Sequence, residues 1–136
     1  QAGTGAAGGL GFAFLSYTNA VLESGVKIIL EETKLESFIK NADFVITGEG
    51  RLDGQTVMGK APIGVAEIAK KYEKKVLAFG GCVAEDATLC NQYGIDAFFP
   101  ILRTVTTLKE AMDFNHAKEN LSAAVEQVFR LIQSFK

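Results

Sequence analysis

Three short apolar segments, each followed by a helical pattern, constrain the fold of this chain more than any other feature. The segments span residues 44–47, 76–79 and 97–102, and each has the length and the β-favouring residues of a buried strand. Strands that alternate with helices form parallel sheets that are covered by helices on both faces. The sequence therefore predicts one α/β unit with a mostly parallel sheet.

The segments before these strands are predicted from their spacing. Apolar residues from Phe12 to Leu22 recur at roughly helical intervals, and Gly25 is a suitable helix stop. Residues 26–30 (VKIIL) are rich in β-favouring side chains and predict a further strand. Residues 31–40 predict a short surface helix.

The later segments carry clear end signals. Pro62 favours a helix start after the first strand, and Asp86 is predicted to cap the helix after the second. Pro100 predicts either an edge position for the third strand or an end of that strand at Phe99. Thr106 or Thr107 is predicted to cap the next helix. A long amphipathic pattern after residue 115 predicts a helix that packs on the sheet.

The polar segment after the first strand has the residues best suited to chemistry. Residues 48–60 read GEGRLDGQTVMGK. Carboxylates hold Mg²⁺ and share it with substrate phosphates, lysine and arginine offset phosphoryl charge, and glycines let a ligand approach the backbone. Ligands bind at the carboxyl ends of strands in open α/β sheets. The candidate site residues are Gly48, Glu49, Gly50, Arg51, Asp53, Gln55, Thr56, Gly59 and Lys60.

This segment has two alternative interpretations, and one of them is not expected. Gly54 to Lys60 fits G-x-x-x-x-G-K, but Ala61 replaces the hydroxyl residue of a P-loop, and residues 48–53 separate the loop from the strand. We therefore do not expect a P-loop. The other alternative, a solvated connection whose charges are incidental, stays open.

A second glycine-rich segment lies at the start of the chain. Gly3, Gly5 and Gly8 match G-x-G-x-x-G, and Gly9 follows. No strand precedes this motif, so a dinucleotide site is not expected. Two interpretations remain open: a backbone nest in which Gly5, Gly8 and Gly9 meet an anion at a helix N-terminus, or close helix packing through small residues.

Composition excludes several classes of function. The chain has 136 residues and a net charge of −2, which predicts one domain and gives no electrostatic footprint for nucleic acid. No apolar run reaches the length of a membrane span, so we expect no membrane partner. Cys82 and Cys90 are the only cysteines, which fits a cytoplasmic location. Cys82 is predicted to be a small buried residue, and His116 a surface residue.

Three segments of this chain carry a resemblance to a known family. GTGAAGGLGFAF, FVITGEGRLDGQTVMGKAPIGVA and VLAFGGCVAEDATLCNQYGIDAFFPI resemble the C-terminal part of bacterial type I glycerate kinases. The run T-GEG-x-x-D-x-QT-x-x-GK is the most specific of the three. Because the sequence starts at Gln1 inside a glycine-rich run, we expect a piece of a longer chain.

The resemblance implies both a fold and an activity. Members of this family phosphorylate D-glycerate with ATP and Mg²⁺, commonly at the 2-hydroxyl, and have two α/β domains, one of them Rossmann-like. Residues 1–136 would then form a single α/β unit, with residues 1–40 belonging partly to the second domain. The family's N-terminal PDSFK-type segment is absent here, so we expect the missing N-terminal part to be a partner of this chain and the chain alone to be inactive.

The resemblance also suggests roles for the candidate residues. Asp53, Glu49 and Lys60 would be catalytic, with Asp53 and Glu49 near Mg²⁺ or acting as the base for the glycerate hydroxyl. Lys60 and Arg51 would bind phosphate or carboxylate. Gln55 and Thr56 would orient the substrate. Two alternatives remain: a non-catalytic nucleotide- or anion-binding module, and a folding unit that binds no small molecule.

Overall fold

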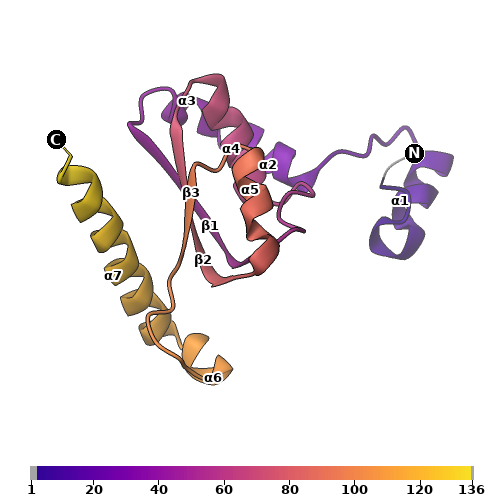
Figure 1. Cartoon of the computed structure of the whole chain (residues 1–136). Coiled ribbons are helices and arrows are strands. Elements are labelled where there is room, and N and C mark those ends of the chain that lie inside the picture. Colours follow the sequence, from indigo (N-terminus) through magenta and orange to yellow (C-terminus); the bar gives the residue numbers. More distant parts are fainter. Residues whose placement is uncertain (1–2, 136) are drawn as a thin grey trace.

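A computed structural model describes residues 3–135 of the chain. Three strands separated by helical segments follow the first three helices, and two further helices end the described part of the chain (Figure 1). The elements are α1 (Ala6–Tyr17), α2 (Gly25–Glu32), α3 (Leu35–Ile39), β1 (Phe44–Leu52), α4 (Ala61–Lys71), β2 (Lys75–Val83), the 3₁₀-helix η1 (Glu85–Thr88), α5 (Leu89–Gln92), β3 (Ala97–Pro100), α6 (Leu108–Ala111) and α7 (Phe114–Gln133).

The three strands form one parallel sheet in the order β1-β2-β3. Val45 pairs with Val76, and Leu77 pairs with Ala97. Their carboxyl ends therefore lie at the same end of the sheet. β3 is an edge strand and ends at Pro100, as expected for a residue that has no N–H to donate. The predicted parallel sheet is confirmed.

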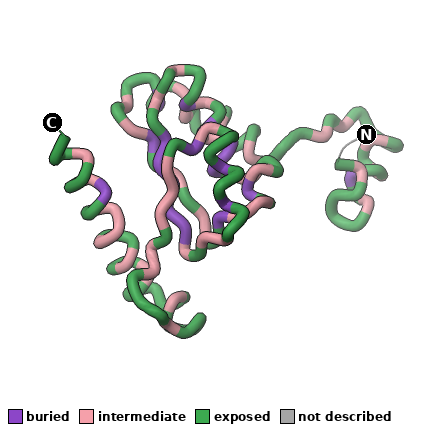
Figure 2. The backbone as a smooth tube through the Cα atoms, in the orientation of Figure 1, coloured by how far each residue is buried: buried purple, intermediate pink, exposed green. Residues whose placement is uncertain are grey.

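Helices cover both faces of the sheet, as predicted. On one face, Val76 and Ala78 of β2 pack in a buried cluster with Ile63 of α4. On the other face, Leu77 and Phe79 pack with Val128 of α7 (Figure 1). Figure 2 shows the buried residues gathered in the sheet and in the helices next to it. The alternation along β2 explains this two-sided core, because successive side chains point to opposite faces.

Strand β1 runs five residues beyond the apolar segment that predicted it. The sequence indicated an end at Thr47, but pairing with β2 continues to Leu52. A Cβ at Gly48 would lie 2.4 Å from the carbonyl oxygen of Phe79, so this close pairing requires glycine there. The core continues to Leu52, which is fully buried. Residues 48–51 are glycine or charged, so the apolar pattern breaks there while the backbone pairing with β2 continues.

The predicted strand at residues 26–30 is wrong, because this segment is part of helix α2. Val26 and Leu30 are four residues apart and therefore share one helix face. A Cβ at Gly64 of α4 would lie 2.7 Å from Val26 Cγ1 and 2.9 Å from Leu30 Cδ1. The tight contact with α4 stabilises a helix despite the β-branched residues, so tertiary packing overrides local propensity.

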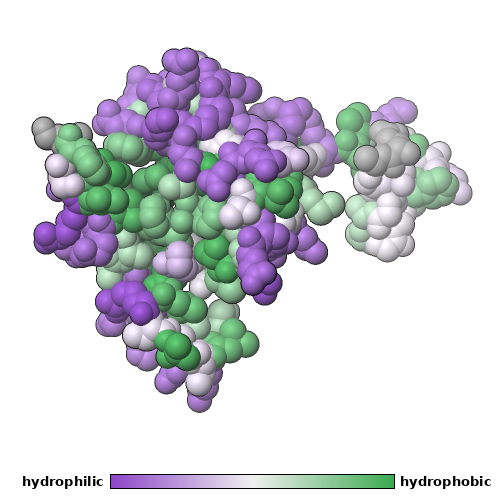
Figure 3. Space-filling view, viewed as in Figure 1, coloured by the Kyte–Doolittle hydropathy of each residue, from purple (hydrophilic) through white to green (hydrophobic). Residues whose placement is uncertain are grey.

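Helix α1 lies apart from the sheet and its covering helices (Figure 1). Its first turn is irregular, with φ values of 50°, 67° and 95° at Ala7, Gly8 and Gly9. It ends at Tyr17, whereas Gly25 begins α2 and does not end a helix. Figure 3 shows hydrophobic side chains both on this separate helix and over β3 with the adjoining part of α7.

The predicted helix caps have mixed outcomes. Thr107 caps α6 in a capping box with Glu110, as expected. Asp86 does not cap α5; it lies inside η1, which leads directly into α5 without a capping side chain. Gly94, with φ of 97°, follows α5 and ends it. Within residues 3–135, no helix has the length and apolar character needed to cross a membrane.

Candidate active site

The carboxyl end of β1 and the turn that follows bring the main candidate residues together. Glu49 lies in β1, Asp53 and Thr56 lie in the turn between β1 and α4, and Lys60 is the residue before α4. Pro62 in the first turn of α4 fixes where that helix starts. The strand and the helix therefore hold the two ends of a short turn that carries the charged groups.

Lys60 bridges the two carboxylates. Its Nζ lies 3.4 Å from Asp53 Oδ1 and 3.7 Å from Glu49 Oε1. The side chains of Asp53 and Glu49 are 17% and 20% exposed, and that of Lys60 is 39% exposed. Both anions are thus mostly shielded, while the shared cation reaches solvent. We call Glu49, Asp53 and Lys60 the carboxyl-end cluster.

Thr56 lies beneath this cluster and has no exposed surface. Its hydroxyl donates to Glu49 Oε1. The Thr56 hydroxyl oxygen also accepts the backbone N–H of Asp53 at 3.1 Å. A single buried hydroxyl thus connects the two acidic residues.

The Asp53 carboxyl is held in its ionised form. Burial raises its pKa, but the hydrogen bond and charge of Lys60 and the backbone N–H groups of Gln55 and Thr56 outweigh this effect, so the pKa lies below its ordinary value. The Gln55 N–H lies 3.0 Å from Asp53 Oδ1. Asp53 is therefore a negative charge throughout the physiological pH range.

The other predicted residues of this segment are either exposed beside the carboxyl-end cluster or contribute through their backbone. Arg51 Nε is 3.3 Å from Asp53 Oδ2, and its side chain is 63% exposed. The Gln55 residue is exposed and takes part through its backbone. Gly48 and Gly50 are inside β1. Gly59, with φ of 89°, makes the turn that delivers Lys60.

The glycines of the N-terminal segment are not part of this arrangement. Gly5 precedes α1, and Gly8 and Gly9 lie in its irregular first turn. A Cβ added at any of these glycines would meet nothing within 4 Å. α1 lies away from the carboxyl end of β1 (Figure 1). The structure therefore separates the two glycine-rich segments that the sequence singled out.

Sequence reasoning missed two neighbours of the site, Asp86 and Cys90. A Cβ at Gly54 would lie 2.5 Å from Asp86 Oδ2, so the turn and η1 are in close contact. The Cys90 Sγ lies 3.9 Å from the carbonyl oxygen of Asp53. Burial raises the pKa of the Cys90 thiol, and the charges of Glu49 and Asp53 raise it further. Only the small size of Gly54 could have signalled the contact with Asp86.

The two other residues considered for reactivity behave differently. Cys82 is exposed, so the expectation of a buried residue is wrong. It pairs in register with Arg51, near the carboxyl end of β2. His116 has a side chain that is 60% exposed and lies on the surface, as predicted.

The donor set for a metal ion is limited to two carboxylates. Among the described residues, no group of three or more His, Cys, Asp or Glu side chains could hold a metal. One or two carboxylates are nevertheless the usual protein contribution to a Mg²⁺ ion that is shared with phosphate. Glu49 and Asp53 fit that donor chemistry, and the oxygen atoms involved now contact Lys60.

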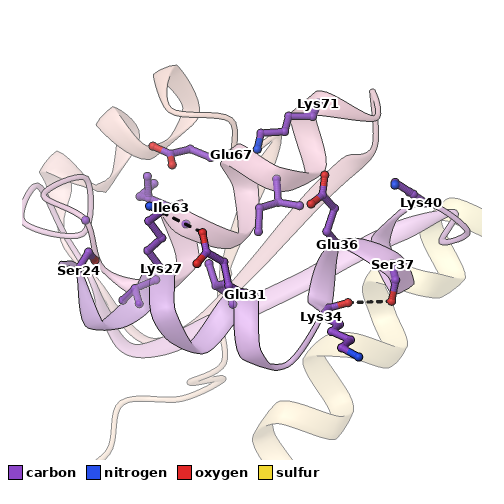
Figure 4. A pocket seen from close by; sticks show the side chains of 15 residues that line it. Ser24, Lys27, Glu31, Lys34, Glu36, Ser37, Lys40, Ile63, Glu67 and Lys71 are labelled. Carbon is purple, nitrogen blue, oxygen red and sulfur yellow. Dashed lines mark hydrogen bonds and ion pairs between the residues drawn. The ribbon is translucent and has the colours of Figure 1, made fainter. Parts of the chain in front are cut away.

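A groove with a volume of about 700 Å³ lies elsewhere, between α2, α3 and α4 (Figure 4). Its charged side chains have mixed sign. Lys27, for example, pairs with Glu23 and lies 3.8 Å from Glu31. Charges that neutralise one another along a groove do not select a ligand. The carboxyl-end cluster is therefore the better candidate.

Comparisons with known proteins agree on one family. The model of the glycerate kinase family matches residues 1–133. The glycerate kinase of Haemophilus influenzae is 42% identical over 97% of this chain and 34% of its own length. The glycerate 2-kinase of Escherichia coli is 44% identical over 93% of this chain and 32% of its own length.

A solved structure gives the same result. The crystal structure of a protein assigned as glycerate kinase 2 of Salmonella typhimurium LT2 superposes with a TM-score of 0.68 and 36% identity, over 98% of this chain and 33% of that one. The chain thus spans about a third of the length of the relatives it matches. By sequence and by fold, the chain belongs to the glycerate kinase family.

Proposed function

We propose that this chain is part of an ATP-dependent kinase that phosphorylates D-glycerate, with the carboxyl-end cluster in the wall of its active site. The observation that carries the proposal is the bridge from Lys60 to Glu49 and Asp53. The relatives named glycerate kinase support the substrate. The relative named glycerate 2-kinase supports the 2-hydroxyl as the position of transfer.

The cations of the site suit a phosphoryl group. Phosphoryl transfer depends on positioning and on stabilising charge that spreads over the phosphoryl oxygens. Lys60 and Arg51 have exposed head groups next to the carboxylates. Lys60 can turn from the carboxylates toward a bound phosphate, because its two contacts are long, at 3.4 and 3.7 Å. We assign phosphate or carboxylate binding to these two cations.

The carboxylates are assigned different roles. Because its pKa is lowered, Asp53 is a weak base, and we assign it to holding the cations. Glu49 is then the residue that accepts the proton of the glycerate hydroxyl. Mg²⁺, when bound with ATP, would neutralise phosphate charge, and Asp53 is the residue that would hold it in this division of roles.

We also propose how the chain is divided. α2 packs on α4 through Val26 and Gly64, so residues from 24 onward form one α/β unit. The separate position of α1 supports the assignment of the first part of the chain to a second domain (Figure 1). Because the relatives are about three times longer, the remainder of such a protein would complete the site, and the chain alone would be inactive.

A cytoplasmic location is part of the same proposal. Cys82 and Cys90 are both free thiols, as expected in a reducing compartment. The substrate and the nucleotide proposed for the site are small molecules, and the net charge of −2 supports no nucleic-acid partner.

The test is ATP consumption in a coupled assay with D-glycerate. The enzyme is a full-length glycerate kinase in which residues 1–136 replace the corresponding segment, and the variant is Asp53→Ala. Turnover by the hybrid and its loss in the variant would support both the reaction and the site. Turnover with a different hydroxy acid would refute the substrate. Binding of ATP without turnover on any acid would favour a non-catalytic module.

A further inference from the structure

We propose that Thr56 is a positioning residue, which holds Glu49 and Asp53 in place by hydrogen bonds from a buried position and does not touch the substrate. This inference rests on the proposed function, because it assigns Thr56 a part in that reaction. It differs from the sequence-based expectation that Thr56 orients the substrate directly.

Burial is the first reason. Thr56 is the only polar or charged residue that is buried within residues 3–135, and its exposed fraction is 0%. A buried hydroxyl must have hydrogen-bond partners, because leaving it unpaired is costly. A side chain without exposed surface cannot contact a small molecule that enters from solvent. Thr56 therefore acts through its protein neighbours.

The direction of its hydrogen bonds is the second reason. A threonine hydroxyl has one proton to donate and can accept from other donors. The Thr56 Oγ1 atom accepts the Asp53 N–H at 3.1 Å, so its own proton points elsewhere. That proton is donated to Glu49 Oε1, and Asp53 Oδ1 lies farther away at 3.5 Å. The Thr56 hydroxyl thus orients the Glu49 side chain as a hydrogen-bond donor and the Asp53 backbone as a hydrogen-bond acceptor.

The backbone of Thr56 links the same residues. Its N–H donates to the Asp53 carbonyl at 3.0 Å, and its carbonyl accepts the Lys60 N–H at 3.3 Å. Each member of the carboxyl-end cluster is therefore bonded directly to Thr56, through side chain or backbone. Losing the hydroxyl would remove the hydrogen bonds to Glu49 and to the Asp53 N–H, while leaving the hydrogen bonds of the Thr56 backbone in place.

The first test is kinetic and uses the full-length hybrid enzyme. Thr56→Val keeps the shape of the side chain and removes the hydroxyl, and Thr56→Ser keeps the hydroxyl. Misplacing a reacting group by about 1 Å can cost about 100-fold in rate. We expect Thr56→Val to lower kcat by about 10- to 100-fold with KM values for D-glycerate and ATP nearly unchanged. Thr56→Ser should restore kcat.

Two kinetic outcomes would overturn the proposal. A raised KM for D-glycerate with unchanged kcat would show that Thr56 binds the substrate directly. Unchanged kcat and KM would show that the hydroxyl has no part in the reaction. Thr33→Val is the matched control, because the Thr33 hydroxyl bonds only to carbonyls of its own helix, Ile29 and Leu30.

The second test does not need activity. Hydrogen exchange of the Asp53 amide, which donates to the Thr56 hydroxyl, is measured in the chain and its variants. Thr56→Val should accelerate exchange at Asp53 by about tenfold and leave the amides of α7 unchanged, whereas Thr56→Ser should not. If exchange in α7 also accelerates, the fold is disturbed and Thr56→Ala is used instead.

The two tests separate the positioning role from the proposed function. If the unmodified hybrid does not phosphorylate D-glycerate, the proposed function fails, and exchange at Asp53 alone then decides whether Thr56 holds the turn. Unchanged exchange at Asp53 in Thr56→Val would overturn the positioning role even if the hybrid is active.

Discussion

Two clusters of lysine and acidic side chains lie at opposite ends of the same sheet. The carboxyl-end cluster has two carboxylates that share Lys60 at 3.4 and 3.7 Å. The amino-end cluster consists of Asp96, Lys70 and Lys75. There, Asp96 Oδ2 lies 2.5 Å from Lys70 Nζ and 2.7 Å from the Val76 N–H, and Lys75 Nζ is 3.6 Å from Asp96 Oδ1.

The two clusters differ in how their charges are satisfied. This difference identifies the amino-end cluster as a structural ion pair and the carboxyl-end cluster as a candidate site. At the amino end, one carboxylate is bonded to a backbone amide and a lysine that also donates to the Lys74 carbonyl at 3.0 Å, so the chain itself satisfies the charges. This cluster ties the end of α4 to the start of β2. At the carboxyl end, the ion-pair contacts are longer, at 3.3 to 3.7 Å, and the side chains of Arg51 and Lys60 reach solvent, which leaves room for a ligand to replace the carboxylates around these cations.

The largest effect should come from removing the shared cation. Lys60→Gln in the full-length hybrid should lower kcat/KM for D-glycerate by about 100-fold, since a positioned charge that stabilises the transition state is lost. Lys70→Gln, its counterpart at the amino end, should leave kcat/KM unchanged and lower the free energy of unfolding by about 1 kcal/mol. Equal kinetic effects of the two substitutions would remove the distinction between the clusters.

The next effect concerns the strand pairing that supports the carboxyl-end cluster. Gly48→Ala places a Cβ 2.4 Å from the Phe79 carbonyl oxygen and should lower the free energy of unfolding by about 2 kcal/mol. Gly50→Ala meets nothing within 4 Å and should change it by less than about 0.5 kcal/mol. Urea unfolding of both variants gives these values. A stable Gly48→Ala variant would mean that β1 does not pair with β2 beyond Thr47.

The smallest effect is in the pH dependence of stability. Burial raises the pKa of Asp96, but the Lys70 hydrogen bond and the Val76 N–H outweigh it, and the pKa lies below its ordinary value of 3.8. A lowered pKa contributes stability that is present above 3.8 and is lost as the pH falls through the folded-state value.

Asp96→Asn should therefore reduce the loss of unfolding free energy between neutral pH and about pH 3. It should not abolish this loss, because Asp53 also has a lowered pKa and the Thr107 cap lowers the pKa of Glu110 to about 2. Urea unfolding at several pH values measures the slope. A slope identical to that of the unmodified chain would show that Asp96 is not paired in the folded state.

The sequence predicted an element correctly where the same apolar side chains both form the pattern and pack in the core. The strands at Val45 and Val76 were recognisable because each begins with a short run of apolar residues that packs in the core, and α4 was recognisable from Pro62. The amphipathic pattern of α7 correctly indicated its packing on the sheet through Val128. Residues 48–60 stood out because charges and glycines follow a buried strand directly.

Other features depend on contacts that no local pattern carries. Residues 26–30 form a helix because Val26 and Leu30 pack closely against Gly64 of α4, which is distant in the sequence. The length of β1 depends on backbone pairing with β2. The burial of Thr56 beneath the carboxylates arises from the turn geometry, which the order of residue types does not determine.

The most direct test compares Asp53→Asn with Asp96→Asn in one full-length hybrid, measuring both D-glycerate phosphorylation and unfolding. Both aspartates pair with lysines and have lowered pKa values. Each substitution therefore removes a comparable ion pair, so a difference in activity between the variants is due to the position of the aspartate. We predict that Asp53→Asn lowers kcat/KM by about 100-fold or more and that Asp96→Asn mainly lowers stability. Retained activity in Asp53→Asn, or equal loss in both, would contradict the assignment of the carboxyl-end cluster as the site of phosphoryl transfer.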